Sequence, residues 1–160
     1  MSSQQLTQDD TQCGPTHVVT CFLLRRDRGH DEVLLARRSE RVRTYRGAWA
    51  AISGYVEPGV APLEQAYQEI REETGLQRED VTLLRTGAAL AFRDADIAQE
   101  WVVHPFLFLA LRPDVAQHDW EAHEFAWTAP DALTSLRTVP QLAEAFARVY
   151  PPATQPGAGA

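Results

Sequence analysis

Three glutamates in the middle of the chain have the spacing that could build a metal site. Glu69, Glu72 and Glu73 lie three and four positions apart, so a helix with about 3.6 residues per turn would place them on one face. Like charges at this spacing destabilise an isolated helix by roughly 0.2–0.5 kcal/mol per pair. A hard divalent cation, which takes oxygen ligands, would offset that repulsion. Solvent and pairing with Arg71 or Arg78 would offset it too, so these residues alone leave both interpretations open.

A helix is predicted to carry these glutamates, beginning at Pro62 and ending before Gly75. Proline suits the first helical position, and glycine is common just beyond the last one. Between them, apolar side chains recur at i, i+3, i+4 and i+7 and form one stripe: Leu63, Ala66, Tyr67 and Ile70. The glutamates therefore flank a surface that is expected to pack on a core.

The segments around this helix are typical of β-strands. They are rich in β-branched and aromatic residues and are separated by turn residues. The predicted strands cover residues 17–25, 32–37, 48–56, 81–92, 101–111 and 124–127, and helical segments are expected at 130–135 and 140–150. Strands on both sides of a central helix, with a further helix at the end, predict an α/β fold with a mixed sheet covered on two faces.

Length and composition restrict the class of protein. The 160 residues fit one domain, expected at residues 16–150 between flexible tails at 1–15 and 151–160. No apolar run approaches the roughly 20 residues that span a bilayer, and the first ten residues lack a secretory signal, so we expect a cytoplasmic protein without a membrane partner. A net charge of −7 disfavours long nucleic acid as a partner. Two cysteines, Cys13 and Cys21, do not form a disulfide framework.

The segment from Gly54 to Leu76 resembles the Nudix box, G-x5-E-x7-R-E-U-x-E-E-x-G-U, in which U is an aliphatic residue. Seven of the nine specified positions agree: Gly54, Glu69, Ile70, Glu72, Glu73, Gly75 and Leu76. Val60 stands where the family has Glu, and Gln68 where it has Arg. The resemblance implies a Nudix-type α/β/α sandwich with a mixed β-sheet between helices, in which Gly54 and Gly75 have structural roles.

The same resemblance implies a metal-dependent hydrolase. Such an enzyme would cleave a pyrophosphate bond in a nucleoside diphosphate linked to another group, as in a nucleotide, a nucleotide sugar, ADP-ribose or a coenzyme A-like substrate. The chemistry agrees with the glutamate face, because metal ions that bridge carboxylates and phosphate oxygens neutralise developing charge. The implied cofactor is Mg²⁺ or Mn²⁺, and the implied ligands are Glu69, Glu72 and Glu73, with Glu57 as a further candidate.

A later loop could supply another catalytic acid, as it does in several family members. Glu121 lies six residues before Trp127 and is the candidate base or ligand, with Glu124 as the alternate. A solvated surface glutamate is the competing interpretation for either residue, since exposed glutamates are common.

Arginines and aromatic residues crowd the segment before the box. Guanidinium groups bind phosphate in bidentate fashion and aromatic rings stack on bases. The segment therefore predicts a phosphate-and-base pocket formed by Arg38, Arg43, Tyr45, Arg46 and Trp49. The alternative is that the arginines decorate a surface loop while the aromatic pair belongs to the core.

The two departures from the box bear on catalysis more than on folding. In the family the missing Glu and Arg would pair and brace the loop against the helix. Because Val60 and Gln68 leave no unpaired charge, we expect the fold to remain stable. The orientation of the Glu69 carboxylate, however, would be less well fixed without the pair. We expect activity on a small nucleotide-type molecule and leave open whether the two departures weaken it. The alternative is a nucleotide-metabolite sensor with little or no catalysis. The substrate, the preferred ion and the oligomeric state, a homodimer included, are left open.

Overall fold

Two long strands form the centre of the sheet in the computed structural model, which describes residues 14–113 and 124–152. β1 (Thr16–Asp27) and β7 (Gln99–Ala110) run parallel to each other. Residues 19–24 of β1 are all buried. An uninterrupted buried run is typical of a strand whose two faces are both covered.

The remaining strands add to this centre in antiparallel fashion. β2 and β4 pair with different halves of β1, β5 and β6 pair with β7, and β3 and β8 pair with β2. A turn at Arg28 and Gly29, both with positive φ, joins β1 to β2 as predicted. The bounds are β2 (His30–Arg37), β3 (Trp49–Ala50), β4 (Ile52–Tyr55), β5 (Val81–Thr86), β6 (Leu90–Asp94) and β8 (Glu124–Thr128).

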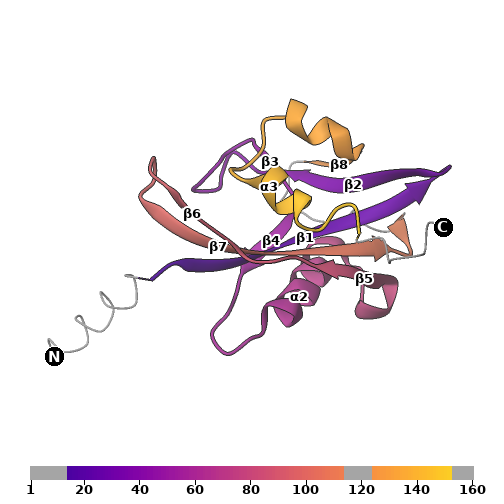
Figure 1. The fold of residues 1–160 in the computed structure, drawn as a ribbon, viewed down its shortest axis with the longest axis horizontal. Coiled ribbons are helices and arrows are strands. Elements are labelled where there is room, and N and C mark those ends of the chain that lie inside the picture. The colour runs from indigo at the N-terminus through magenta and orange to yellow at the C-terminus, as the bar shows by residue number, and fades with distance from the viewer. Residues whose placement is uncertain (1–13, 114–123, 153–160) are drawn as a thin grey trace, which may run out of the picture.

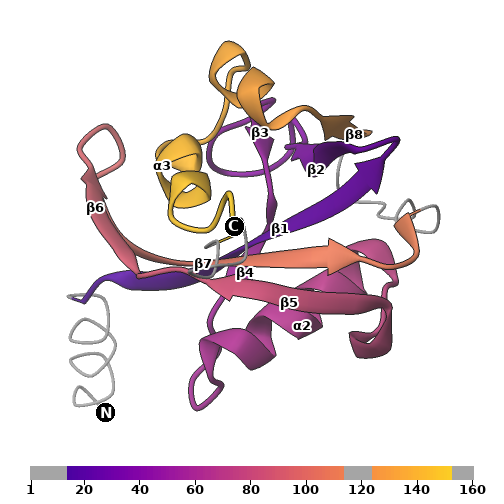
Figure 2. The ribbon, with the colours of Figure 1, turned by 45° about the vertical axis from the view of Figure 1, so that its right-hand side comes forward.

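Helices cover both faces of the sheet (Figures 1 and 2). α2 (Pro62–Thr74) packs on the core that contains Val19, Cys21 and Leu23 of β1. α3 (Leu142–Ala147) packs on the opposite core, with Phe22 and Leu24. Successive side chains of β1 thus enter alternate cores, as the pleat requires. The predicted α/β sandwich with a mixed sheet between helices is confirmed. Two 3₁₀ helices, η1 (Arg78–Asp80) and η3 (Pro130–Ser135), complete the described elements.

Three predicted elements were wrong in extent. The strand expected at 48–56 is two strands, because β3 pairs with β2 and β4 pairs with β1. The strand expected at 81–92 is divided at Gly87 into β5 and β6. The helix expected at 140–150 spans only Leu142–Ala147, since Gln141 before it has a left-handed φ of 65°.

Most of the predicted tails, residues 1–13 and 153–160, lie outside the described residues. Within the part that the structure describes, no helix is long and apolar enough to cross a membrane.

Candidate active site

The helix that carries the glutamates has the predicted bounds. α2 begins at Pro62, and Gly75 ends it in a left-handed conformation with φ 81°, where its N–H donates to the carbonyl of Arg71 at 2.9 Å. Glycine adopts this conformation without the steric penalty of a Cβ. Ala66 and Ile70 of the apolar stripe are buried against the sheet. The glutamates therefore lie on a rigid element.

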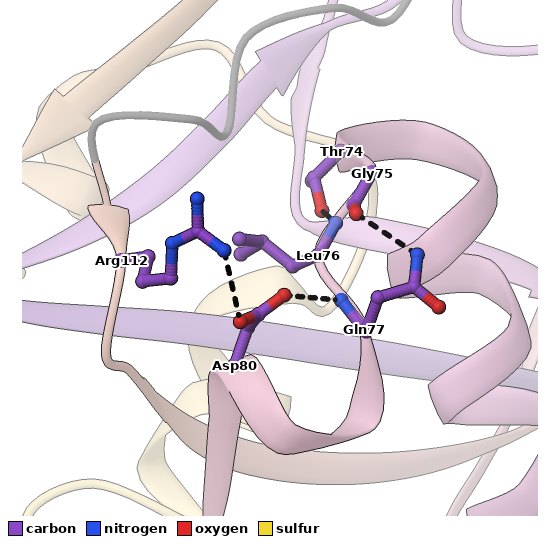
Figure 3. A network of polar contacts seen from close by, with 6 residues as sticks. All are labelled: Thr74, Gly75, Leu76, Gln77, Asp80 and Arg112. Atoms are coloured by element: carbon purple, nitrogen blue, oxygen red, sulfur yellow. Dashed lines mark hydrogen bonds and ion pairs between the residues drawn. The ribbon is translucent and has the colours of Figure 1, made fainter.

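A polar network fixes the segment that follows α2 (Figure 3). The hydroxyl of Thr74 accepts a hydrogen bond from the Leu76 N–H at 3.1 Å. Asp80 accepts one from the Gln77 N–H at 2.8 Å and faces Arg112 at 3.5 Å. These bonds satisfy backbone donors just beyond the helix end. They hold in place the last turn of α2, which carries two of the three glutamates.

Glu69 lies directly against β4 at Gly54. A Cβ built on Gly54 would be 2.2 Å from Glu69 Cδ and 2.4 Å from Glu69 Oε1. Gly54 is paired with Val19 of β1, whose side chain belongs to the α2 core. The Glu69 carboxylate thus occupies the space that any other residue at position 54 would fill, which gives this glycine its structural reason.

A buried glutamine that the sequence reasoning missed holds the Glu69 carboxylate. Gln65 is 1% exposed. Its Nε2 donates to Glu69 Oε2 at 2.9 Å, and its Oε1 accepts from the Glu57 N–H at 3.1 Å. The i, i+4 spacing of Gln65 and Glu69 on a helix was a usable signal, but glutamines are mostly exposed, so the burial could not be read from the sequence.

The other two predicted ligands lie on the following turn of α2. Gln68 Nε2 donates to Glu72 Oε1 at 3.3 Å. The thiol of Cys21 is buried, and burial raises its pKa well above the usual value, with smaller contributions from the charges of Glu73 and then Glu69. The negative charges of Glu73 and Glu69 therefore both influence the thiol of Cys21 on β1. The buried thiol stays protonated at neutral pH.

The donor set of α2 fits a hard divalent cation. All of its groups are carboxylate oxygens, and Mg²⁺ is commonly held by one or two carboxylates together with water and substrate phosphates. Among residues 14–113 and 124–152, no three His, Cys, Asp or Glu side chains already form a metal-binding group. The structure therefore does not bring Glu69, Glu72 and Glu73 together as a ready-made three-residue metal site. Glu57 contributes its backbone N–H to Gln65, while its side chain is exposed.

A cavity of about 180 Å³ adjoins Gly54 on the α3 side of the sheet. β4 pairs with β1 alone among the described strands, so Gly54 lies at a sheet edge between the cavity and Glu69. Aromatic rings line much of the cavity: Tyr45, Tyr55, Phe92 and Trp101. Tyr55 and Trp101 are stacked, with ring centroids 6.4 Å apart. The indole N–H of Trp101 is buried and faces the hydroxyl of Tyr45, with which it interacts.

Tyr45 closes one side of this cavity. Its backbone has a φ of 54°, and its hydroxyl donates to Asp94 Oδ2 at 2.6 Å. Burial, followed by the hydrogen bond to Asp94 and the charge of that carboxylate, raises the pKa of Tyr45 to about 12. The phenol therefore stays protonated at neutral pH and ties its loop to the β6–β7 hairpin.

Only part of the predicted substrate-binding set reaches the cavity. Arg38 and Tyr45 line it, and the Arg38 Nε donates to the carbonyl of Thr44 at 3.0 Å. Arg43 and Arg46 are exposed. Trp49 packs against the α3 core and does not line the cavity. For Trp49 the structure thus favours the competing interpretation, a residue of the core.

Of the two candidate acids on the later loop, only Glu124 lies within the part of the chain that the structure describes. Glu121 lies outside it. Glu124 forms an ion pair with Arg37 across β8 and β2 at 3.2 Å. Its neighbour Phe125 packs on the α2 core, so strand alternation directs Glu124 away from the α2 side of the sheet. The structure does not bring Glu124 to the helix glutamates.

Comparisons with known proteins agree with this architecture. The family model described as NUDIX domain matches residues 15–149. A solved Ap4A hydrolase binary complex from C. elegans has a TM-score of 0.68 at 18% identity, over 83% of this chain and 93% of that chain. The Nudix hydrolase RenU from M. smegmatis has a TM-score of 0.69 at 21% identity, over 83% and 82%.

A third solved structure is the NUDIX domain of Shewanella oneidensis NrtR complexed with ADP ribose. Its TM-score is 0.64 at 13% identity, over 93% of this chain and 96% of that chain. At these identities the likeness to solved structures shows a shared fold. No curated protein matches the chain.

Proposed function

Because the chain belongs to the NUDIX domain family, we propose that it is a divalent-metal-dependent hydrolase that cleaves a pyrophosphate bond in a nucleoside diphosphate linked to another group. The predicted family is confirmed by the family match. Solved neighbours named as hydrolases support the proposal of hydrolysis. One observation carries the proposal for this chain: the Glu69 carboxylate is held over the bare backbone of Gly54, beside a cavity of about 180 Å³. The family match over residues 15–149 supports a single catalytic domain at 16–150.

The proposed ligands of the cation are Glu69, Glu72 and Glu73, with Mg²⁺ or Mn²⁺ as the ion. Bound there, the cation would stabilise the charge that develops on the phosphate oxygens. The protein's own contribution is orientation: the contacts of Glu69 with Gln65 and Gly54 fix one carboxylate before substrate arrives. Glu57 remains a proposed further ligand.

A general base completes the proposed chemistry. Glu121 is the proposed base, since Glu124 is engaged in an ion pair with Arg37. A base must come within hydrogen-bond reach of the attacking water, directly or through one further water.

The cavity is proposed to bind the base of the substrate. Its aromatic rings offer flat apolar walls on which a base can stack. Arg38 at the rim, together with the exposed Arg43 and Arg46, is proposed to contact phosphate. The substrate then crosses the edge of the sheet at Gly54, with its phosphates at Glu69.

The test is a product-chromatography screen with Mg²⁺ and with Mn²⁺. Substrates are nucleoside triphosphates and diphosphates, ADP-ribose, nucleotide sugars, dinucleoside polyphosphates and coenzyme A. Two neighbours give the order of priority, since one is named as an Ap4A hydrolase and the other was crystallised with ADP ribose. Metal-dependent cleavage of a pyrophosphate bond, absent from a Glu69→Gln preparation, supports the proposal.

A nucleotide sensor is the second candidate, favoured by the uncharged Val60 and Gln68 in the box. Isothermal titration calorimetry separates the two functions. Tight binding of a nucleotide without cleavage under either ion would establish the sensor and overturn the hydrolase.

A further inference from the structure

The structure assigns to Gln65 the task of aiming Glu69, and we propose that it is the positioning residue that replaces the missing charged pair of the box. The proposal rests on the proposed function in one respect, namely that Glu69 binds the cation. It adds a residue outside the specified positions of the motif. It also explains how a box with Val60 and Gln68 can keep Glu69 oriented.

The side-chain amide of Gln65 is buried and hydrogen-bonded at both ends. Gln65 is 1% exposed, and both ends of its amide are hydrogen-bonded, at 2.9 Å to Glu69 and 3.1 Å to Glu57. Burying an amide is costly unless its groups are satisfied. A glutamine whose role was only to fill volume would carry this cost without benefit, because an apolar side chain would fill the same space.

The orientation of the amide is fixed by its neighbours. The backbone N–H of Glu57 can only donate, so it requires the oxygen of the Gln65 amide. The NH₂ end must then face Glu69, where it donates to Oε2. With Oε2 held by Gln65 and Oε1 lying over the Gly54 backbone, the carboxylate has little freedom to rotate. A carboxylate restricted in this way is pre-oriented for a cation.

The same glutamine ties the loop before α2 to the helix. Glu57 lies between β4 and α2, in a loop whose Val56 N–H donates to the carbonyl of His17 at 2.9 Å. The family's pair would make this link at positions 60 and 68, but here Gln68 bonds to Glu72 within the helix. The connection between loop and helix therefore runs through Gln65, one turn earlier in α2.

The experiment compares Gln65→Met with wild type. Methionine keeps the length and volume of the side chain and removes both hydrogen bonds. The matched control is Glu64→Gln, an adjacent and exposed position whose carboxylate pairs with Arg78. The readouts are Mn²⁺ affinity by isothermal titration calorimetry without substrate, kcat, KM and thermal unfolding.

We expect Gln65→Met to lower Mn²⁺ affinity and kcat by about 10–100-fold each, the usual effect of losing a group that orients a metal ligand. KM should change by less than about threefold, because Gln65 does not contact the substrate. The control should retain wild-type values. Gln65→Asn, which keeps a buried amide but is one methylene too short to reach both partners, should show the same losses and covers the case in which methionine prevents folding.

The outcomes separate this proposal from the proposed function. If both Gln65 variants bind Mn²⁺ within twofold of wild type while Glu69→Gln does not, the positioning role is overturned and the metal site stands. If Glu69→Gln also leaves Mn²⁺ affinity unchanged, both proposals are overturned. Equal losses in the Glu64→Gln control would show a general effect on α2 and would also overturn the positioning role.

Discussion

Replacing Gly54 by alanine tests whether the close approach of Glu69 to β4 is required for catalysis. The new methyl carbon would lie 2.2 Å from Glu69 Cδ, whereas ordinary contact begins at 3.4 Å. The carboxylate must therefore retreat by about 1.2 Å, the difference between the two distances. Gly54 does not have a positive φ, so the backbone of β4 accepts alanine without strain.

This retreat should remove the 2.9 Å hydrogen bond from Gln65 to Glu69. A misplacement of about 1 Å can cost about 100-fold in rate. We expect kcat/KM of Gly54→Ala to fall about 100-fold. The free energy of unfolding should fall by no more than about 1–3 kcal/mol, the usual cost of a crowded substitution, because the group that must move is the end of a flexible side chain.

Steady-state kinetics and thermal unfolding measure the two effects separately. Gly87→Ala is the matched control, since its new Cβ would lie 2.8 Å from Val149 in the α3 core, away from the glutamates. That variant should lose stability and keep wild-type kcat/KM. Wild-type activity in Gly54→Ala, or equal losses of activity in the two variants, would refute the argument from the Glu69 contact.

Four further predictions concern the cation, the cavity and pH. Glu69→Gln should lower kcat at least about 100-fold with a wild-type melting temperature, and near-normal turnover would contradict the metal site. Arg46→Ala should mainly raise KM, so an unchanged KM would remove this residue from the phosphate site. Trp101→Ala removes an aromatic wall worth about 1–3 kcal/mol in stacking on a base, so nucleotide Kd should rise at least about fivefold by calorimetry, and an unchanged Kd would contradict base recognition. For His104 on β7, burial and, to a smaller extent, electrostatic repulsion from His17 lower the pKa from 6.5. The folded state therefore binds a proton less readily than the unfolded chain, and the free energy of unfolding falls as the pH drops below about 6.5. His104→Gln should lose less melting temperature than wild type between pH 7 and 5, and equal losses would contradict this prediction.

The features that were predictable from the sequence depend on neighbours in the chain. Pro62 and Gly75 bracket α2 because both act on the local backbone. The turn at Arg28 and Gly29 is local in the same sense. The spacing of Glu69 with the two later glutamates follows from helical geometry alone.

The features that were not predictable depend on pairing between distant segments. The division of residues 48–56 into β3 and β4 follows from pairing with two different strands. Trp101 reaches the cavity because β7 pairs in parallel with β1 and brings it beside Tyr55 of β4. Gln65 is buried where it bonds to the backbone of Glu57, a residue of the loop before α2. Local patterns carry none of this information.

The position of Gly54 at the sheet edge has a consequence for how such an enzyme can diversify. On one side of this residue lie the glutamates, all from the continuous segment 54–76. On the other side lies a cavity assembled from strands and loops far apart in the chain. If the cavity binds substrate as proposed, substitutions in its lining other than at Gly54 would change which molecule is accepted without displacing the Glu69 carboxylate. A lineage with this layout can acquire new substrates while it inherits its chemistry unchanged.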